Sequence, residues 1–80
     1  MYKYTNQRVM KTPEPIEIIT DYVDENNYQH IDCYFTDDEN EEGKTVAIVS
    51  QDTGKEFFLD NMYYSNERVQ AAIKEVQAEL

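Results

Sequence analysis

Apolar and polar residues alternate along two segments in the first half of the chain, and this alternation strongly limits what the chain can fold into. The segment Ile16–Val23 alternates over most of its length, and His30–Phe35 alternates throughout. A period of two is typical of a β-strand that buries one face. In the second segment, Ile31, Cys33 and Phe35 are predicted to point inward. The chain therefore begins its ordered part with two half-buried strands.

The segments that follow extend this sheet. Asp24–Asn27 is rich in turn-forming residues and separates the first two strands. Thr45–Ser50 is almost entirely apolar, as expected of a central strand. Gln51–Lys55 contains Gly54 and is predicted to be a hairpin turn, with Glu56–Asp60 as the returning strand.

The last part of the chain has the pattern of a helix. Ser65 is a suitable N-cap, and Glu67 follows in the first turn, where the helix dipole favours an acid. The apolar residues that recur at steps of three and four are Val69, Ala72, Ile73, Val76 and Leu80. This stripe predicts one helix over residues 65–80 that packs against the sheet.

Together these patterns predict a single α+β domain spanning residues 1–80. Residues 16–60 would form an antiparallel meander of three to five strands, and the C-terminal helix would cover one face. Residues 1–13 carry Lys3, Arg8 and Lys11 and no acid, so they are predicted to be a basic arm or an edge strand. The prolines at positions 13 and 15 separate this segment from the rest.

The acidic residues are concentrated between Glu14 and Asp60. This stretch holds fourteen acids against Lys44 and Lys55, a formal charge of −12 in a protein whose net charge is −10. Such a surface repels nucleic acid and anionic membranes but attracts proteins that bind nucleic acid. We therefore expect no direct nucleic-acid binding and no membrane association.

The residues that most metal and catalytic sites require are scarce. Cys33 is the only cysteine and His30 the only histidine, too few for a structural zinc site, and a lone cysteine fits a reducing, cytoplasmic setting. The stretch Asp38–Gly43 resembles the start of a calcium-binding loop, but the twelfth position is Val49 rather than glutamate. A solvated loop is the favoured interpretation, and weak divalent-cation binding stays open. We expect no cofactor and no enzymatic activity.

One helix covers only one face of a sheet, and the other face is predicted to be acidic and aromatic. The residues expected on it are Glu17, Asp21, Asp32, Tyr34, Glu56, Phe58 and Asp60. The acidic loop between the second and third strands would add Asp37, Asp38, Glu39, Glu41 and Glu42. Two interpretations follow: an ordinary solvated face, or carboxylates spaced like backbone phosphates.

In size, charge, acid-rich strands and sheet-plus-helix layout, the chain resembles small acidic inhibitors encoded by phages and mobile elements. These are anti-CRISPR proteins, anti-restriction DNA mimics and uracil-DNA glycosylase inhibitors. The segment Ser50–Phe58 is similar to the hairpin of the small phage glycosylase inhibitors. The resemblance implies a protein that blocks a nucleic-acid enzyme by occupying its basic groove.

The expected partner is therefore a basic protein such as a nuclease, a glycosylase or a nuclease–RNA complex. Two alternatives remain. One is a non-catalytic structural or regulatory module, monomeric or homodimeric, whose acidity serves solubility. The other is a minimal metal-dependent enzyme.

Overall fold

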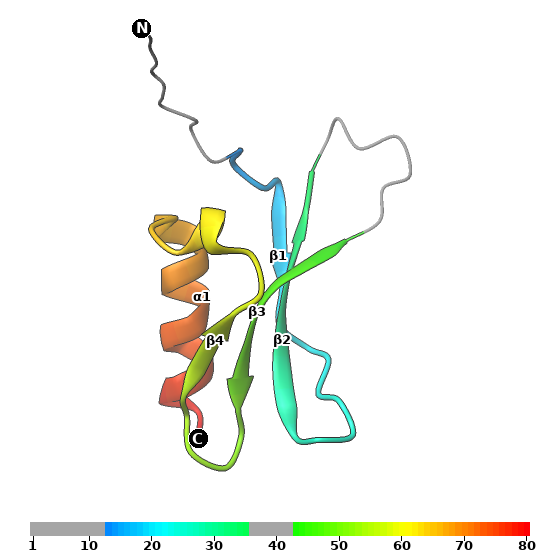
Figure 1. The fold of residues 1–80 in the computed structure, drawn as a ribbon, viewed down its shortest axis with the longest axis vertical. Coiled ribbons are helices and arrows are strands. Elements are labelled where there is room, and N and C mark those ends of the chain that lie inside the picture. Colours follow the sequence, from blue (N-terminus) through cyan, green and yellow to red (C-terminus); the bar gives the residue numbers. More distant parts are fainter. Residues whose placement is uncertain (1–12, 36–42) are drawn as a thin grey trace, which may run out of the picture.

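The computed structural model describes residues 13–35 and 43–80. In this part of the chain, four strands form one antiparallel sheet in the order β1-β2-β3-β4, followed by a short 3₁₀ turn and a helix (Figure 1). The elements are β1 (Glu17–Ile19), β2 (Tyr28–Tyr34), β3 (Lys44–Ser50), β4 (Glu56–Phe58), η2 (Asn61–Tyr63) and α1 (Glu67–Ala78). The predicted α+β meander with one C-terminal helix is confirmed.

The first strand is much shorter than the predicted Ile16–Val23. It ends at Ile19 because the next backbone carbonyl, that of Thr20, accepts a hydrogen bond from the Gln29 side chain. The chain pairs with β2 again further on, where the His30 amide donates to the Tyr22 carbonyl at 2.8 Å. The predicted strand is therefore present only over Glu17–Ile19, and Ile16 and Tyr22 on either side of it are each 56% exposed.

Both predicted turns are present, and each contains a residue with positive φ. In the first, the Asp24 carboxylate accepts hydrogen bonds from the backbone amides of Asn26 and Tyr28, at 2.9 and 3.0 Å. Asn27 completes this turn at φ 67°, in the left-handed region that asparagine tolerates. In the second, Gly54 has φ 79°, as its position in the hairpin required.

A β-bulge interrupts the pairing of β2 with β3. Ile31 pairs with Ala47 and Asp32 with Thr45, so Val46 is the extra residue on β3. Val46 and Ala47 are adjacent in sequence, yet both are fully buried. The bulge thus brings two consecutive side chains into the core and leaves Thr45 on the opposite face.

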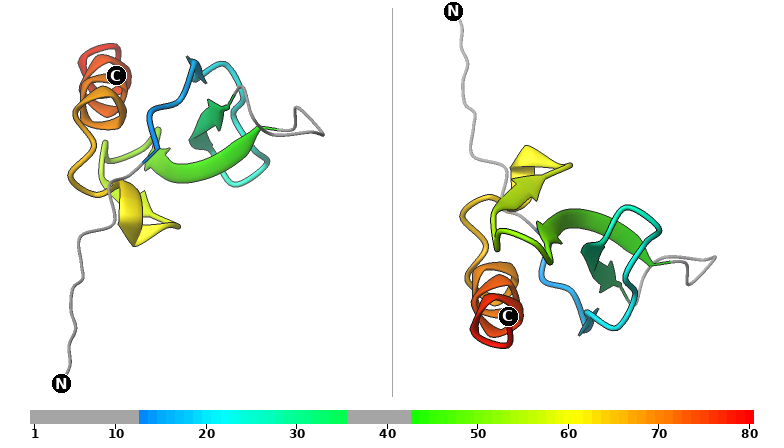
Figure 2. Two further views of the ribbon diagram at one scale, coloured as in Figure 1. Left: turned by 90° about the horizontal axis from the view of Figure 1, so that it is seen from above. Right: turned by 90° about the horizontal axis from the view of Figure 1, so that it is seen from below.

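The core lies between the sheet and α1, which stands on one side of it (Figure 2). The sheet contributes Ile31, Cys33, Val46, Ala47 and Val49, and the helix contributes Val69, Ile73 and Val76. Phe35 is partly buried against this cluster, as its inward phase predicted. Leu80 lies beyond the end of α1 and is 51% exposed, so the predicted stripe is shorter by one residue.

The helix begins one residue later than predicted. Its N-cap is Asn66 rather than Ser65, because the Asn66 Oδ1 atom accepts hydrogen bonds from the amides of Arg68 and Val69 at 3.0 and 3.1 Å. No sequence pattern predicted η2, which is capped by the Asp60 carboxylate. These two caps set the path from β4 to α1.

The chain segment before β1 is fastened to the start of α1. Pro15 is buried, and its carbonyl accepts a hydrogen bond from the Arg68 guanidinium. Arg68 also lies 4.0 Å from the Glu14 carboxylate. No helix in the described residues has the length and apolar content needed to cross a membrane.

Candidate interaction face

The side of the sheet opposite α1 is the candidate site, and we call it the open face. Register partners in a sheet share a face and successive residues alternate, so the partners of core residues identify the other side. In the described residues, the open face carries Glu17, Ile19, Tyr28, His30, Asp32, Tyr34, Thr45, Ile48, Ser50 and Phe57.

Three of the predicted site residues meet on this face. Glu17 on β1 is the register partner of Tyr34 on β2, and Asp32 lies two residues from Tyr34 on the same strand. Glu17 is exposed, whereas Asp32 and Tyr34 are half-buried. A Cβ atom added to Gly43 would lie 2.4 Å from the Tyr34 ring, so this glycine leaves the ring the space that it occupies.

Two other predicted residues, Glu56 and Phe58, lie on the wrong side of the sheet for that role. Their register partners are Val49 and Ala47, which point into the core. Phe58 accordingly packs against the core, and Phe57 takes the open-face position with 40% of its surface exposed. The sequence could not set this phase, because a three-residue strand with two adjacent phenylalanines fits either register equally well.

Two further predicted acids, Asp21 and Asp60, are described and lie outside the strands. Asp21 is exposed in the segment after β1. Asp60 caps η2 and forms an ion pair with Lys44. The loop residues Asp37, Asp38, Glu39, Glu41 and Glu42 lie outside the described residues, as do most of the calcium-like stretch Asp38–Gly43 and residues 1–12 of the basic arm.

The open face is divided into an acidic and an aromatic part. Residues 13–35, which contain β1 and β2, include six acids and no Lys or Arg. Toward β4, the Tyr28 and Phe57 rings meet edge to face with centroids 6.0 Å apart. The Lys55 ammonium lies 5.3 Å from the centre of the Phe57 ring. Negative charge is therefore gathered at the β1–β2 side.

A row of hydrogen-bonded polar side chains that was not predicted from the sequence crosses the open face. The His30 Nε2 atom lies 2.9 Å from Asp24 Oδ2, and its Nδ1 atom lies 3.3 Å from Thr45 Oγ1. The Thr45 hydroxyl in turn donates to Asp32 Oδ1 at 2.5 Å. The Tyr22 ring packs edge-on against the imidazole, with centroids 4.7 Å apart. The outward phase of His30 and Asp32 was the signal that could have revealed this row.

Asp24, at one end of this row of polar side chains, accepts several hydrogen bonds that stabilise its ionised form. The hydrogen bond with His30 lowers the pKa of Asp24 below its ordinary value, and the backbone amides of Tyr28 and Asn26 lower it further. His30 and the two turn amides therefore favour the ionised form of Asp24.

Lys44 and Asp60 neutralise each other beside the core. Their hydrogen bond lowers the pKa of the Asp60 carboxyl and raises the pKa of the Lys44 ammonium. The same ammonium lies 5.9 Å from the centre of the Tyr63 ring. This pair fixes the connection to η2 and contributes little net charge to the surface.

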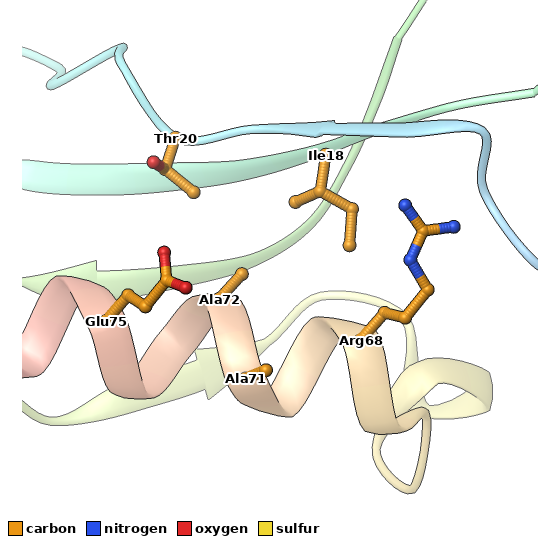
Figure 3. Close-up of a pocket in the computed structure, with 6 residues that line it drawn as sticks. All are labelled: Ile18, Thr20, Arg68, Ala71, Ala72 and Glu75. Carbon is orange, nitrogen blue, oxygen red and sulfur yellow. The ribbon is translucent and has the colours of Figure 1, made fainter.

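A shallow pocket of about 260 Å³ lies on the other side of the molecule, between β1 and α1 (Figure 3). It is lined by Ile18, Thr20, Arg68, Ala71, Ala72 and Glu75. Arg68 and Glu75 point from the helix toward β1, on either side of Ala72. Within the described ranges, no three His, Cys, Asp or Glu side chains are grouped so that they could hold a metal ion.

No protein-family model matches the chain, and neither the curated proteins nor the solved structures give a match. In residues 13–35 and 43–80, the chain is an acidic α+β domain in which α1 covers one face of the sheet.

Proposed function

We propose that this protein is a non-catalytic inhibitor that binds a nucleic-acid enzyme and occupies its basic groove. The observation that carries the proposal is the grouping of Glu17, Asp32 and Tyr34 on the sheet face that α1 leaves uncovered. The acids of the described residues outnumber Lys and Arg by twelve to four. A basic groove is the surface that such a charge attracts most strongly.

The sheet sets the carboxylates at regular positions. Diagonal neighbours on adjacent strands, as Glu17 and Asp32 are, lie about 7–8 Å apart. This separation is comparable with that between successive phosphates along a nucleic-acid strand, so a groove that fits a phosphate backbone also fits this strand pair. Asp32 is further fixed by the Thr45 hydroxyl.

Aromatic side chains supply the contacts that charge alone does not. Tyr34 lies beside the acids, and Phe57 is 40% exposed at the other side of the same face. Tyrosine and other aromatics dominate the binding energy of many interfaces because they bury much surface with few rotatable bonds. The two parts of the open face thus favour a protein partner over a simple counter-ion.

The test is affinity capture from a bacterial lysate at low salt, followed by assays of the captured enzyme. We expect recovery of a basic nuclease, glycosylase or nuclease–RNA complex whose activity the protein inhibits. We also expect competing DNA to displace the protein, and salt to weaken the complex strongly. A complex that resists both DNA and about 0.5 M salt would overturn the proposal.

A matched pair of variants separates the open face from the general charge. E17Q/D32N and the helix variant E75Q/E79Q remove the same formal charge, and all of these residues except Asp32 are exposed. The first variant should lose most of its affinity for the enzyme and the second little. Equal losses would mean that net charge, rather than the open face, makes the contact.

The aromatic part of the open face favours a second candidate, a homodimeric structural module. Two copies that paired across Phe57 and Tyr28 would bury this apolar surface from water. Sedimentation distinguishes the two functions, because a stable dimer lost in F57A would leave this part of the face unavailable to an enzyme.

A further inference from the structure

The pocket between β1 and α1 is open because the helix side chains in its middle are short. Ala71 and Ala72 end at their Cβ atoms, whereas the larger apolar side chains of α1 belong to the core cluster with β2 and β3. Ile18 and Thr20 point from the strand side toward the helix and form the opposite wall (Figure 3). The middle of the pocket is mainly apolar, since Ile18 and the two alanines carry no polar side-chain atom.

Opposite charges lie at the two ends of this pocket. Arg68 is in the first turn of α1 and Glu75 is in its last part, and both point toward β1 on either side of Ala72 (Figure 3). Among the described residues, the Glu75 carboxylate has no ion pair and no hydrogen bond. The pocket thus has a cation at one end and an unpaired anion at the other.

Arg68 keeps donors that can bind a ligand. Its guanidinium carries several N–H groups, and the Pro15 carbonyl accepts a hydrogen bond from only one nitrogen, Nη1. The Glu14 carboxylate is 4.0 Å away, which is beyond hydrogen-bond distance. The contact with Pro15 holds the guanidinium at the end of the pocket, and its other donors can bind a carboxylate.

The volume of the pocket and the spacing of its charges indicate the size of the ligand. Pockets for drug-sized ligands have about 300–1,000 Å³, so a volume of about 260 Å³ suits a smaller molecule. The backbone positions of Arg68 and Glu75 are separated by about 10 Å along the helix axis. With a hydrogen bond of about 3 Å at each end, a ligand spans the rest if its charges are about 4–5 Å apart. Two or three methylene groups between an ammonium and a carboxylate give this separation.

We propose that this pocket binds a short ω-amino acid, with its carboxylate on Arg68, its ammonium on Glu75 and its methylene chain over Ala72. The helix dipole favours this orientation, because Arg68 is near the N-terminal end of α1 and Glu75 near its C-terminal end. The Thr20 hydroxyl, which has no partner among the described residues, is available to the ligand as a further hydrogen-bonding group. The pocket is separate from the open face, so this inference is independent of the proposed function.

An NMR titration of the protein with 4-aminobutyrate tests the proposal. For a ligand of this size we expect a dissociation constant of about 1 mM, with amide shift changes confined to the residues that line the pocket. Butyrate and butylamine each lack one of the two charges and should bind about tenfold more weakly. Glycine, whose charges are too close together to span the pocket, should also bind weakly. Equal binding of butyrate and 4-aminobutyrate, or no shift change up to about 20 mM ligand, would overturn the proposal.

Two matched pairs of variants locate the site. E75Q should weaken the binding of 4-aminobutyrate about tenfold, whereas E79Q, which changes an exposed acid outside the pocket, should leave it unchanged. A71L should fill the pocket and abolish binding, whereas A78L, at an exposed alanine outside the pocket, should not. Thermal melting shows whether each variant is folded, and the E75Q pair carries the test if A71L is not. Wild-type affinity in folded E75Q would overturn the proposal.

Discussion

At the scale of single residues, Cys33 shows how strongly the core suppresses side-chain reactivity. The residue is fully buried beside Ile31 and the helix side chains. Burial raises the pKa of its thiol to about 11, and the charge of the neighbouring Asp32 adds to the effect. Because the thiolate is the reactive form, the native residue should behave as a small apolar side chain.

We therefore predict that Cys33 is inert to thiol reagents in the folded protein, even at about pH 9, a pH at which a free thiol is largely ionised. Its labelling rate should follow the global unfolding equilibrium and rise sharply in urea. Mass spectrometry of samples labelled with and without denaturant measures both. Rapid labelling of the native protein would show that the core opens locally around β2.

Asp24 gives a prediction about acid stability. Its folded pKa lies below the ordinary value of 3.8, so folding favours the ionised carboxylate. This contribution is fully present above the ordinary value and is lost as the pH falls through the folded pKa. D24N should therefore be less stable than the wild type at neutral pH, and the difference should shrink below about pH 3. Urea unfolding at several pH values measures it, with E25Q as the control that should show no such convergence.

At the scale of elements, periodicity predicted the parts of the fold that bury one face. Ile31 and Cys33 alternate with polar residues in β2, and Ile73 belongs to the apolar stripe of α1 that recurs at steps of three and four. These two periods predict a strand and a helix. The sequence pattern did not predict the features that depend on a single side chain hydrogen-bonded to the backbone. Gln29 ends β1 through a side-chain hydrogen bond, and Asp60 caps an unpredicted turn.

The candidate site was predictable to a similar extent. Strand phase correctly placed Asp32 and Tyr34 on the uncovered side of the sheet. It placed Glu56 and Phe58 on the wrong face, because two adjacent aromatic residues in a short strand do not indicate which of them points into the core. The contacts of His30 depend on β3 register and on a turn, neither of which a single strand pattern contains.

The helix start gives a direct comparison between the predicted and the observed cap. N66A should lower the free energy of unfolding by about 1 kcal/mol, because two backbone amides lose their acceptor. S65A should change it little, since Ser65 is exposed and outside the cap. Urea denaturation of both variants makes the comparison. The reverse ranking would mean that α1 begins one residue earlier.

At the scale of the whole molecule, the net charge of −10 works against the compact state. We predict that the melting temperature rises by several degrees between about 0.01 M and 0.5 M NaCl, because screening weakens the repulsion. Exposed ion pairs such as Lys44–Asp60 oppose this trend only slightly. Calorimetry measures the slope, and E67Q/E75Q/E79Q, with three fewer negative charges, should reduce it. A melting temperature that falls with salt would show that local ion pairs outweigh the general repulsion.

The order of the elements along the chain has a consequence for synthesis on the ribosome. All four described strands precede α1, so the side of the sheet with Ile31, Cys33 and Val49 is made before the helix that covers it. At a synthesis rate of roughly 5–20 residues per second, several seconds pass between the synthesis of the strands and that of Val69, Ile73 and Val76. Stable folding should therefore begin only when α1 has left the exit tunnel. Until then, the acidity of the strand segments keeps the nascent chain soluble while its apolar side is uncovered.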